Sequence, residues 1–203
     1  MLSLDSALIA IAAEFTGPYA PYQGVALTPG PTGGVFVAAT DQGRIACIAF
    51  DPRGRGDESI YLLPSSELLR ACKGLKTAER EVTLNEQTAL VTTFRKSAGN
   101  EVKEIPITKS QVTPPPLAKI MRHCIDTWGA TPSLSETAGR YATEYIERAV
   151  KSLSNREKSL VFCGFDGGPM RIQSHTGDVI ILVMPQTAEP IPAIPAWLQD
   201  FAA

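Results

Sequence analysis

The same order of predicted elements occurs in two parts of the chain. Residues 58–107 predict a short strand, an amphipathic helix and three further strands separated by turn residues. Residues 142–184 predict a helix and three strands in the same order, with almost no identical residues. We expect two copies of one structural unit. Such a repeat favours an architectural or binding protein over a protein with a single catalytic site.

The helices are predicted from apolar residues at helical spacing. Each copy of the repeat contains one helix, at residues 65–75 and 142–153, and another helix is expected near residues 5–15. The clearest pattern lies at residues 117–128, where the apolar residues are Leu117, Ile120, Met121, Cys124, Ile125 and Trp128. We therefore expect four helices.

Three predicted strands precede the first copy and have no counterpart before the second. Residues 25–28, 35–40 and 44–50 form these strands, and Asp41-Gln42-Gly43 is the expected turn of a hairpin between the last two. The last strand of the second copy, residues 179–184, is continuously apolar, which is typical of a strand buried on both faces or at a subunit contact. We predict an α+β fold with a shortened second copy.

A Pro-rich segment separates the two copies. Residues 106–116 contain four prolines around Lys109, Ser110 and Gln111, a composition typical of an extended linker. We predict a first domain at residues 1–108, a linker at residues 109–116, an abbreviated second domain at residues 117–188 and a Pro-rich tail at residues 189–203.

The composition limits the possible partners and compartments. A formal net charge of −2 excludes a surface that is basic throughout, but it allows a local basic face. Cys47, Cys72, Cys124 and Cys163 are widely spaced and form no CxxC pair, which is typical of buried thiols in a reducing compartment rather than of a zinc site. No basic segment precedes the first apolar residues, so we expect a cytoplasmic protein with no signal peptide and no membrane partner.

The sequence contains no recognisable catalytic motif. It has no G-x-S-x-G, no H-E-x-x-H and no complete phosphate-binding loop. His123 and Cys124 are neighbours on a predicted helix and point about 100° apart, so they cannot act as base and nucleophile. Cys163 and His175 could meet across a hairpin, but a buried thiol and a turn histidine explain them more simply. We expect no catalytic residue, metal or cofactor, and a small enzyme with an unrecognised site is our third alternative.

Lysine and arginine recur on three predicted helices, away from the apolar residues. Most such charge simply solvates a helix, and the spacing of Glu144 from Arg148 and of Glu147 from Lys151 suits ion pairs within one helix. Cations on the helices of an acidic chain also suit contacts to phosphates without base readout. We predict sequence-independent contacts to double-stranded DNA from Arg70, Lys73, Lys76, Arg80, Lys119, Arg122, Arg148 and Lys151.

Three short segments match phrases of a known protein family. Residues 35–46, Val-Phe-Val-Ala-Ala-Thr-Asp-Gln-Gly-Arg-Ile-Ala, are similar to its Ala-Thr-Asp-Gly-His-Arg followed by Leu-Ala, although here Gln42 precedes Gly43 and the histidine is absent. Residues 60–75 are similar to a strand that ends in a proline and enters a Leu-rich helix. Residues 169–172 and 179–185 resemble a closing hairpin that ends in Met-Pro, here Met184 and Pro185. The chain thus resembles the sliding clamps of replication, specifically the β clamp of bacterial DNA polymerase III.

The resemblance implies repeated domains, each with two helices on a β shell, that close into a ring around DNA. It implies a homo-oligomer without catalysis, whose partners are a polymerase or other clamp-binding peptides, and a partner groove to which Met184 and Pro185 contribute. Residues 117–185 leave no room for the hairpin expected between the two helices, so the second domain is expected to be truncated. The resemblance implies three domains in a clamp subunit, so this chain would need a different subunit number to close a ring, or it closes none. Our alternative is a clamp-fold protein-interaction module without DNA binding.

The tail contains apolar residues that resemble the ligand of such a groove, namely Trp197, Leu198 and Phe201. We hypothesise that the tail occupies the groove of its own chain or of a neighbour. Deletion of residues 189–203 is then expected to raise the binding of a clamp-binding peptide.

Overall fold

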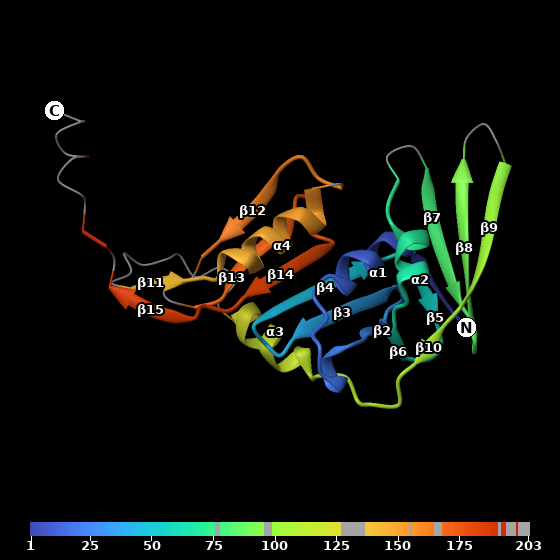
Figure 1. Cartoon of the computed structure of the whole chain (residues 1–203), viewed down its shortest axis with the longest axis horizontal. Coiled ribbons are helices and arrows are strands. Elements are labelled where there is room, and N and C mark those ends of the chain that lie inside the picture. Colours follow the sequence, from blue (N-terminus) through green and yellow to red (C-terminus); the bar gives the residue numbers. More distant parts are fainter. Residues whose placement is uncertain are drawn as a thin grey trace.

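Short helices separate groups of antiparallel strands along the chain (Figure 1). The computed structural model describes residues 1–75, 78–95, 99–126, 137–154, 156–164, 168–190, 192–193 and 198, and of Ile120, His123, Cys124, Thr137 and Glu189 it describes the backbone alone. The first part contains β1 (Leu2–Asp5), α1 (Ser6–Ala13), a 3-10 turn (Ala20–Tyr22), β2 (Val25–Pro29), β3 (Val35–Asp41), β4 (Ile45–Asp51) and β5 (Arg55–Gly56).

The remaining elements form the two copies of the predicted repeat. The first copy contains β6 (Ile60–Leu63), α2 (Ser66–Cys72), β7 (Glu79–Leu84), β8 (Thr88–Arg95), β9 (Gly99–Pro106) and β10 (Thr108–Lys109). After α3 (Leu117–Asp126), the second copy contains β11 (Thr137–Arg140), α4 (Thr143–Ser154), β12 (Leu160–Cys163), β13 (Met170–Ser174), β14 (Val179–Val183) and β15 (Thr187–Pro190). The predicted α+β class with a shortened second copy is confirmed.

The two copies share more than the order of their elements. In each copy the last strand returns to pair antiparallel with the first, β10 with β6 and β15 with β11. When the helix starts are aligned, the buried Leu68 and Cys72 of α2 correspond to the buried Tyr145 and Ala149 of α4. The unit is therefore a strand, a helix, a three-stranded meander and a closing strand.

One sheet runs through both halves of the chain. The strand order is β10-β6-β2-β3-β4-β14-β13-β12 in this sheet, β5-β1-β7-β8-β9 in the second and β11-β15 in the third. The halves join where β4 pairs with β14, from Ile45 opposite Val183 to Ala49 opposite Val179. All of β14 except Ile180 is buried, so residues on both faces of this strand are covered, as its apolar sequence predicted.

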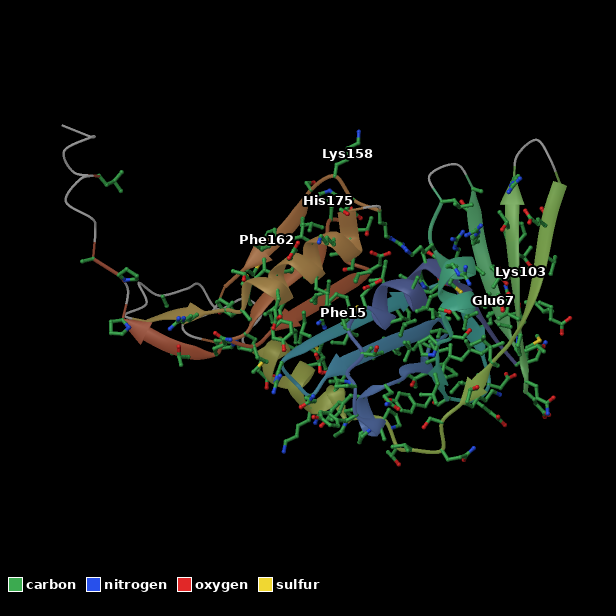
Figure 2. The ribbon with its side chains drawn as sticks, viewed as in Figure 1. Phe15, Glu67, Lys103, Lys158, Phe162 and His175 are labelled. Atoms are coloured by element: carbon green, nitrogen blue, oxygen red, sulfur yellow. The ribbon has the colours of Figure 1, made fainter. Side chains whose placement is uncertain are left out.

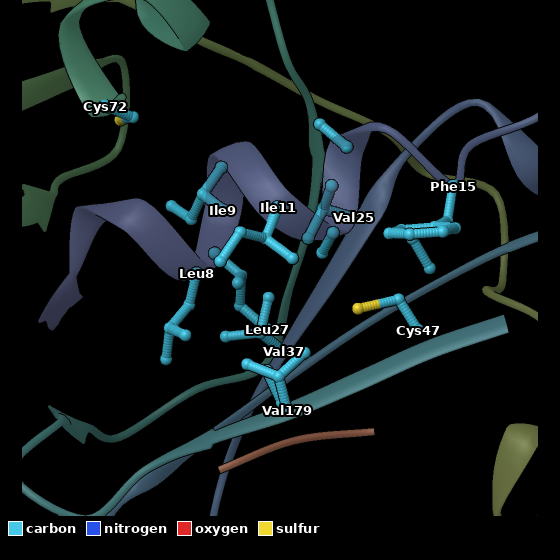
Figure 3. Packing of buried hydrophobic residues seen from close by; sticks show 14 of the residues in the cluster. Leu8, Ile9, Ile11, Phe15, Val25, Leu27, Val37, Cys47, Cys72 and Val179 are labelled. Atoms are coloured by element: carbon cyan, nitrogen blue, oxygen red, sulfur yellow. The ribbon is translucent and has the colours of Figure 1, made fainter. Parts of the chain in front are cut away.

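The core lies between α1 and the two larger sheets. Helix α1 is apolar on nearly every face because it contacts α2 as well as strands of both sheets. The Asp5 carboxylate caps it by accepting a hydrogen bond of 2.9 Å from the Ala7 N–H. Figure 3 shows Leu8 and Ile11 of α1 beside Leu27, Val37 and Val179, so residues from both halves of the chain meet under this helix.

The predicted hairpin between β3 and β4 turns at Asp41-Gln42-Gly43-Arg44. Gln42 and Gly43 both have positive φ, +50° and +75°, and the Arg44 N–H donates to the Asp41 carbonyl over 2.9 Å. Because Asp41 pairs with Ile45, three residues connect the two strands, and the positive φ of Gln42 and Gly43 turns the chain back sharply. The turn presents Asp41 and Arg44 towards α4.

Helix α3 lies on the face of the eight-stranded sheet opposite to α1 and α4 (Figure 1). Val25, Leu27 and Val37 face the core, whereas the alternate residues Ala26, Thr28 and Ala38 line a groove together with residues 114–118, where α3 begins. The helix predicted from its apolar periodicity is present, but its Ile125 is 62% exposed, and Trp128 lies outside the described residues. Helix α1, which precedes the first copy, packs against α2, whereas Figure 1 shows α3 away from α4.

Candidate nucleic-acid interface

Helices α1, α2 and α4 lie on the same side of the sheets, and α2 and α4 carry the predicted cations of this side (Figure 1). Ser65 caps α2 by accepting a hydrogen bond from the Leu68 N–H over 3.2 Å, which fixes where the helix begins. Arg70 lies on the exposed face of α2, Lys73 follows the last residue of the helix, and both are exposed. Arg70 donates to the Ser66 carbonyl, and neither cation forms an ion pair within the described part of the chain. Lys76 lies outside the described residues.

Arg80 is used inside the fold. Its Nη1 donates to the carbonyls of Ala71 and Lys73, both at 2.9 Å, and its Nε donates to Thr93 Oγ1 at 3.1 Å. The last carbonyls of a helix lack partners within the helix. Arg80 supplies partners at the end of α2 and ties the helix to the second sheet.

The cations of α4 are also partly engaged. Lys151 forms an ion pair of 2.6 Å with Glu147, four residues earlier, as the spacing suggested. Arg148 lies 5.4 Å from the ring centre of Tyr145, and its Nη1 is 3.6 Å from Asp41 Oδ2, in the turn of the first half. A hydrogen bond with Tyr145 raises the pKa of the neighbouring Arg44. Arg148 therefore joins the halves as well as adding positive charge.

The other predicted site residues do not gather on this side. Lys119 and Arg122 are exposed on α3, on the opposite face of the sheet. Met184 and Pro185 are half-buried after β14, where the Met184 N–H donates to the Arg44 carbonyl over 2.9 Å. Neither residue lines the groove of about 290 Å³ that runs between β2, β3 and residues 114–118. Leu198 is exposed, and Trp197 and Phe201 lie outside the described residues.

An ion-pair cluster between the halves has no signal in the sequence. Arg156 Nη1 lies 3.1 Å from Asp5 Oδ2, and Arg156 Nη2 lies 2.5 Å from Asp178 Oδ2. Asp178 also accepts hydrogen bonds from Ser174 and Thr176, at 2.7 and 2.6 Å. Burial on its own would raise the pKa of Asp178, but these hydrogen bonds and the Arg156 charge outweigh it and hold the pKa below its ordinary value.

The described residues contain no cluster of three or more His, Cys, Asp or Glu side chains that could hold a metal ion. Cys47 and Cys72 are buried, as predicted, and burial raises the pKa of both thiols, that of Cys72 to about 12. Within the described part of the chain, no helix has the length and apolar character needed to span a bilayer.

Comparison with known proteins identifies the fold. No family model matches the sequence, and no curated protein matches it. Solved structures do match: the DNA polymerase III beta subunit of Thermotoga maritima is 12% identical, with a TM-score of 0.56 over 98% of this chain and 67% of that one. The chain has the sliding-clamp fold.

Further sliding clamps agree with this assignment. The DNA polymerase sliding clamp of Pseudomonas aeruginosa is 11% identical, with a TM-score of 0.59 over 91% of this chain and 65% of that chain. The DNA polymerase III beta subunit of Borrelia burgdorferi is 7% identical, with a TM-score of 0.57 over 92% and 64%. The resemblance predicted from three short segments is confirmed for the fold, and the chain spans about two thirds of the length of these clamps.

Proposed function

We propose that this protein is a sliding-clamp-like DNA-binding protein that acts through an oligomeric ring with sequence-independent phosphate contacts. The clamp fold supports the proposal, and two exposed cations carry it, Arg70 on α2 and Lys73 directly after this helix. They lie on the side that holds α1, α2 and α4, and they have no intramolecular ion pair among the described residues. The proposal involves no catalytic step.

The proposed contact set is narrower than the sequence prediction. Arg148 and Lys151 belong to the same side and add positive charge, although each already has a carboxylate neighbour. Arg80 is left out because its guanidinium caps α2. Lys119 and Arg122 are left out because α3 lies on the opposite face.

A charge reversal on each face tests the proposal. We expect Arg70→Glu/Lys73→Glu to weaken binding to a duplex and to lower the slope of log K against log salt by about 2, because two phosphate contacts are lost. Lys119→Glu/Arg122→Glu makes the same change in net charge on the other face and is the matched control. Fluorescence anisotropy at several salt concentrations measures both. Equal losses in the two variants would show that only the overall charge matters, and the proposed face would then be wrong.

The ring is tested separately by topology. A closed ring is expected to stay on a nicked circular plasmid during gel filtration and to slide off after the plasmid is linearised. Equal retention on both forms would contradict encirclement.

The alternative is a clamp-fold protein-interaction module without DNA binding. It is favoured by the engagement of Arg80, Arg148 and Lys151 in contacts within the chain. Wild-type protein that binds no duplex even at low salt would select this alternative, since electrostatic binding is strongest there.

A further inference from the structure

The outer face of the five-stranded sheet is open to solvent along β7, β8 and β9. Helix α1 packs against β7, and α2 packs against β8 and β9, on the core side of this sheet (Figure 1). Side chains along a strand point alternately to its two faces. The buried Val82, Val91 and Ile105 mark the core side. The residues that alternate with them, such as Glu81 and Thr92, therefore point outwards.

The charged residues of these three strands are sorted between the two faces. Arg80, Arg95 and Lys103 alternate in phase with the core residues. Arg80 binds the end of α2, and Lys103 Nζ lies 2.8 Å from Glu67 Oε1 of the same helix (Figure 2). The charged residues that point outwards are all acids, namely Glu79, Glu81 and Glu104. Among the described residues of β7, β8 and β9, the outer face thus has three carboxylates and no cation.

The negative charge of this face is mostly uncompensated. Glu79 Oε2 lies 3.7 Å from Arg53 Nη1 of a neighbouring loop, in a pair exposed on both sides that contributes little. Glu81 and Glu104 form no ion pair within the described chain, and both are exposed. Beside Glu79 and Glu81 lies a hollow of about 120 Å³, which Phe94 also lines. The hollow has room for the end of a cationic side chain.

An apolar patch lies between these acids. Phe94 is 40% exposed, Val102 is 60% exposed, and Leu90 is half-buried. Thr92 pairs with Val102, so Leu90 and Phe94, two residues to either side of Thr92, are the diagonal neighbours of Val102. The three apolar side chains therefore form one patch, with the acids of β7 on one side and Glu104 on the other.

This pattern matches the surface of a basic amphipathic helix. Leu90 and Phe94 are four residues apart on one strand, which is about 13 Å. Two turns of a helix cover a similar length, about 11 Å, and carry an apolar stripe with polar residues on both flanks. A helix laid along β8 would place its stripe on the patch and its lysines or arginines against the acids. Nucleic acid does not fit, because its phosphates would face carboxylates.

We infer that this outer face docks a basic amphipathic helix of another protein. The residues that make the contact are Leu90, Phe94, Val102, Glu79, Glu81 and Glu104. The face lies on the side of the sheet opposite α2, which carries the proposed DNA contact Arg70. A protein partner and a duplex are therefore able to occupy the molecule together.

A charge reversal on the full chain tests the contact in the absence of DNA. The probe is a synthetic peptide of about 18 residues, long enough for a helix, with leucines in the stripe and lysines on the flanks. Its affinity is measured by fluorescence anisotropy at physiological salt. Glu81→Lys/Glu104→Lys is expected to weaken binding about a hundredfold, because two attractions become repulsions.

Glu58→Lys/Glu144→Lys is the matched control, since it makes the same change in net charge at exposed acids outside these strands. It is expected to weaken binding less than about threefold. Circular dichroism checks that both variants fold. If the two double variants lose affinity alike, the peptide responds only to net charge and the docking face is overturned.

The apolar patch is tested without a change in charge. Phe94→Thr/Val102→Thr keeps residues that suit a strand and is expected to weaken binding about tenfold. Val112→Thr/Ile125→Thr, at exposed apolar residues outside the sheet, should leave the affinity unchanged. A scrambled peptide of equal composition but without the stripe should bind at least about tenfold more weakly. Equal binding of both peptides, equal losses in both variants, or no binding to the wild type overturns the inference and leaves the duplex proposal untouched.

Discussion

At the scale of single residues, Arg156 binds two carboxylates from distant parts of the chain. It follows α4 and contacts Asp5, which caps α1, and Asp178, in the turn between β13 and β14. The Asp178 backbone carbonyl also accepts a hydrogen bond from the Phe50 N–H, at the end of β4. One arginine therefore links the start of α1, the hairpin of β13 and β14, and the junction of β4 with β14.

The lowered pKa of Asp178 predicts a loss of stability in acid. A group whose pKa is lower in the folded than in the unfolded state stabilises the fold above the unfolded pKa, about 3.9, and this contribution disappears as the pH falls through the folded pKa. Asp178→Asn should therefore reduce the free energy of unfolding at pH 7 by about 1 kcal/mol, discounted for partial exposure, with a smaller difference at low pH. Urea unfolding at both pH values measures this. A constant difference between the proteins would contradict the assignment.

At the scale of elements, the end of α2 depends on a side chain from the following strand. Arg80→Ala removes the donors to two carbonyls at the end of α2, those of Ala71 and Lys73, and should destabilise the protein by about 1–2 kcal/mol. Arg70→Ala, on the exposed face of the same helix, should change stability by less than about 0.5 kcal/mol. Urea unfolding of the two variants separates the structural arginine from the proposed DNA contact. Similar losses in both would argue against this division.

The first two residues of the predicted tail, residues 189–190, belong to β15, which pairs with β11. The hypothesis that the tail occupies a partner groove stays a prediction, and it is best tested by a cut after Pro190, which spares β15. Removal of residues 191–203 should raise the affinity for a clamp-binding peptide, measured by isothermal titration, if the tail competes for the groove. Unchanged affinity would remove the hypothesis.

Elements with a strong local pattern were predictable, and those that depend on distant partners were not. The Asp5 cap, the alternation in β2 and β3 and the meanders are encoded within a few residues each. Strand β15 was missed, because it is four residues long and acquires its structure from β11. The period of α3 predicted a helix with an apolar face, but it contains no information on which side of the sheet receives that face.

The candidate site was predictable in part for the same reason. Helical spacing put Arg70 and Lys73 away from the buried side of α2, as observed. The roles of Arg80 and Arg156 depend on contacts that cross from one element to another, in the case of Arg156 over 151 residues. Spacing along the sequence cannot report such contacts.

At the scale of the whole molecule, the halves share a sheet and a continuous core. The β4–β14 pairing and the packing of Val179 and Ile181 with first-half residues predict a single cooperative unfolding transition. Leu27→Ala and Ile181→Ala, one in each half, should each cost about 2–4 kcal/mol and shift that same transition. Far-UV circular dichroism and hydrogen exchange of peptides from both halves measure this. Two separate transitions would contradict the prediction.

The closing strand of each repeat has a consequence for how chains of this fold can change in length. Because β15 returns to β11 within its own copy, the second unit completes a small sheet without a preceding β2, β3 and β4. A unit that ends where it began can be removed or added as a block, with one strand pair, β4 with β14, as the junction. The closing strand thus makes half a domain a unit that can be repeated along the chain, although its meander still shares a sheet with the first half.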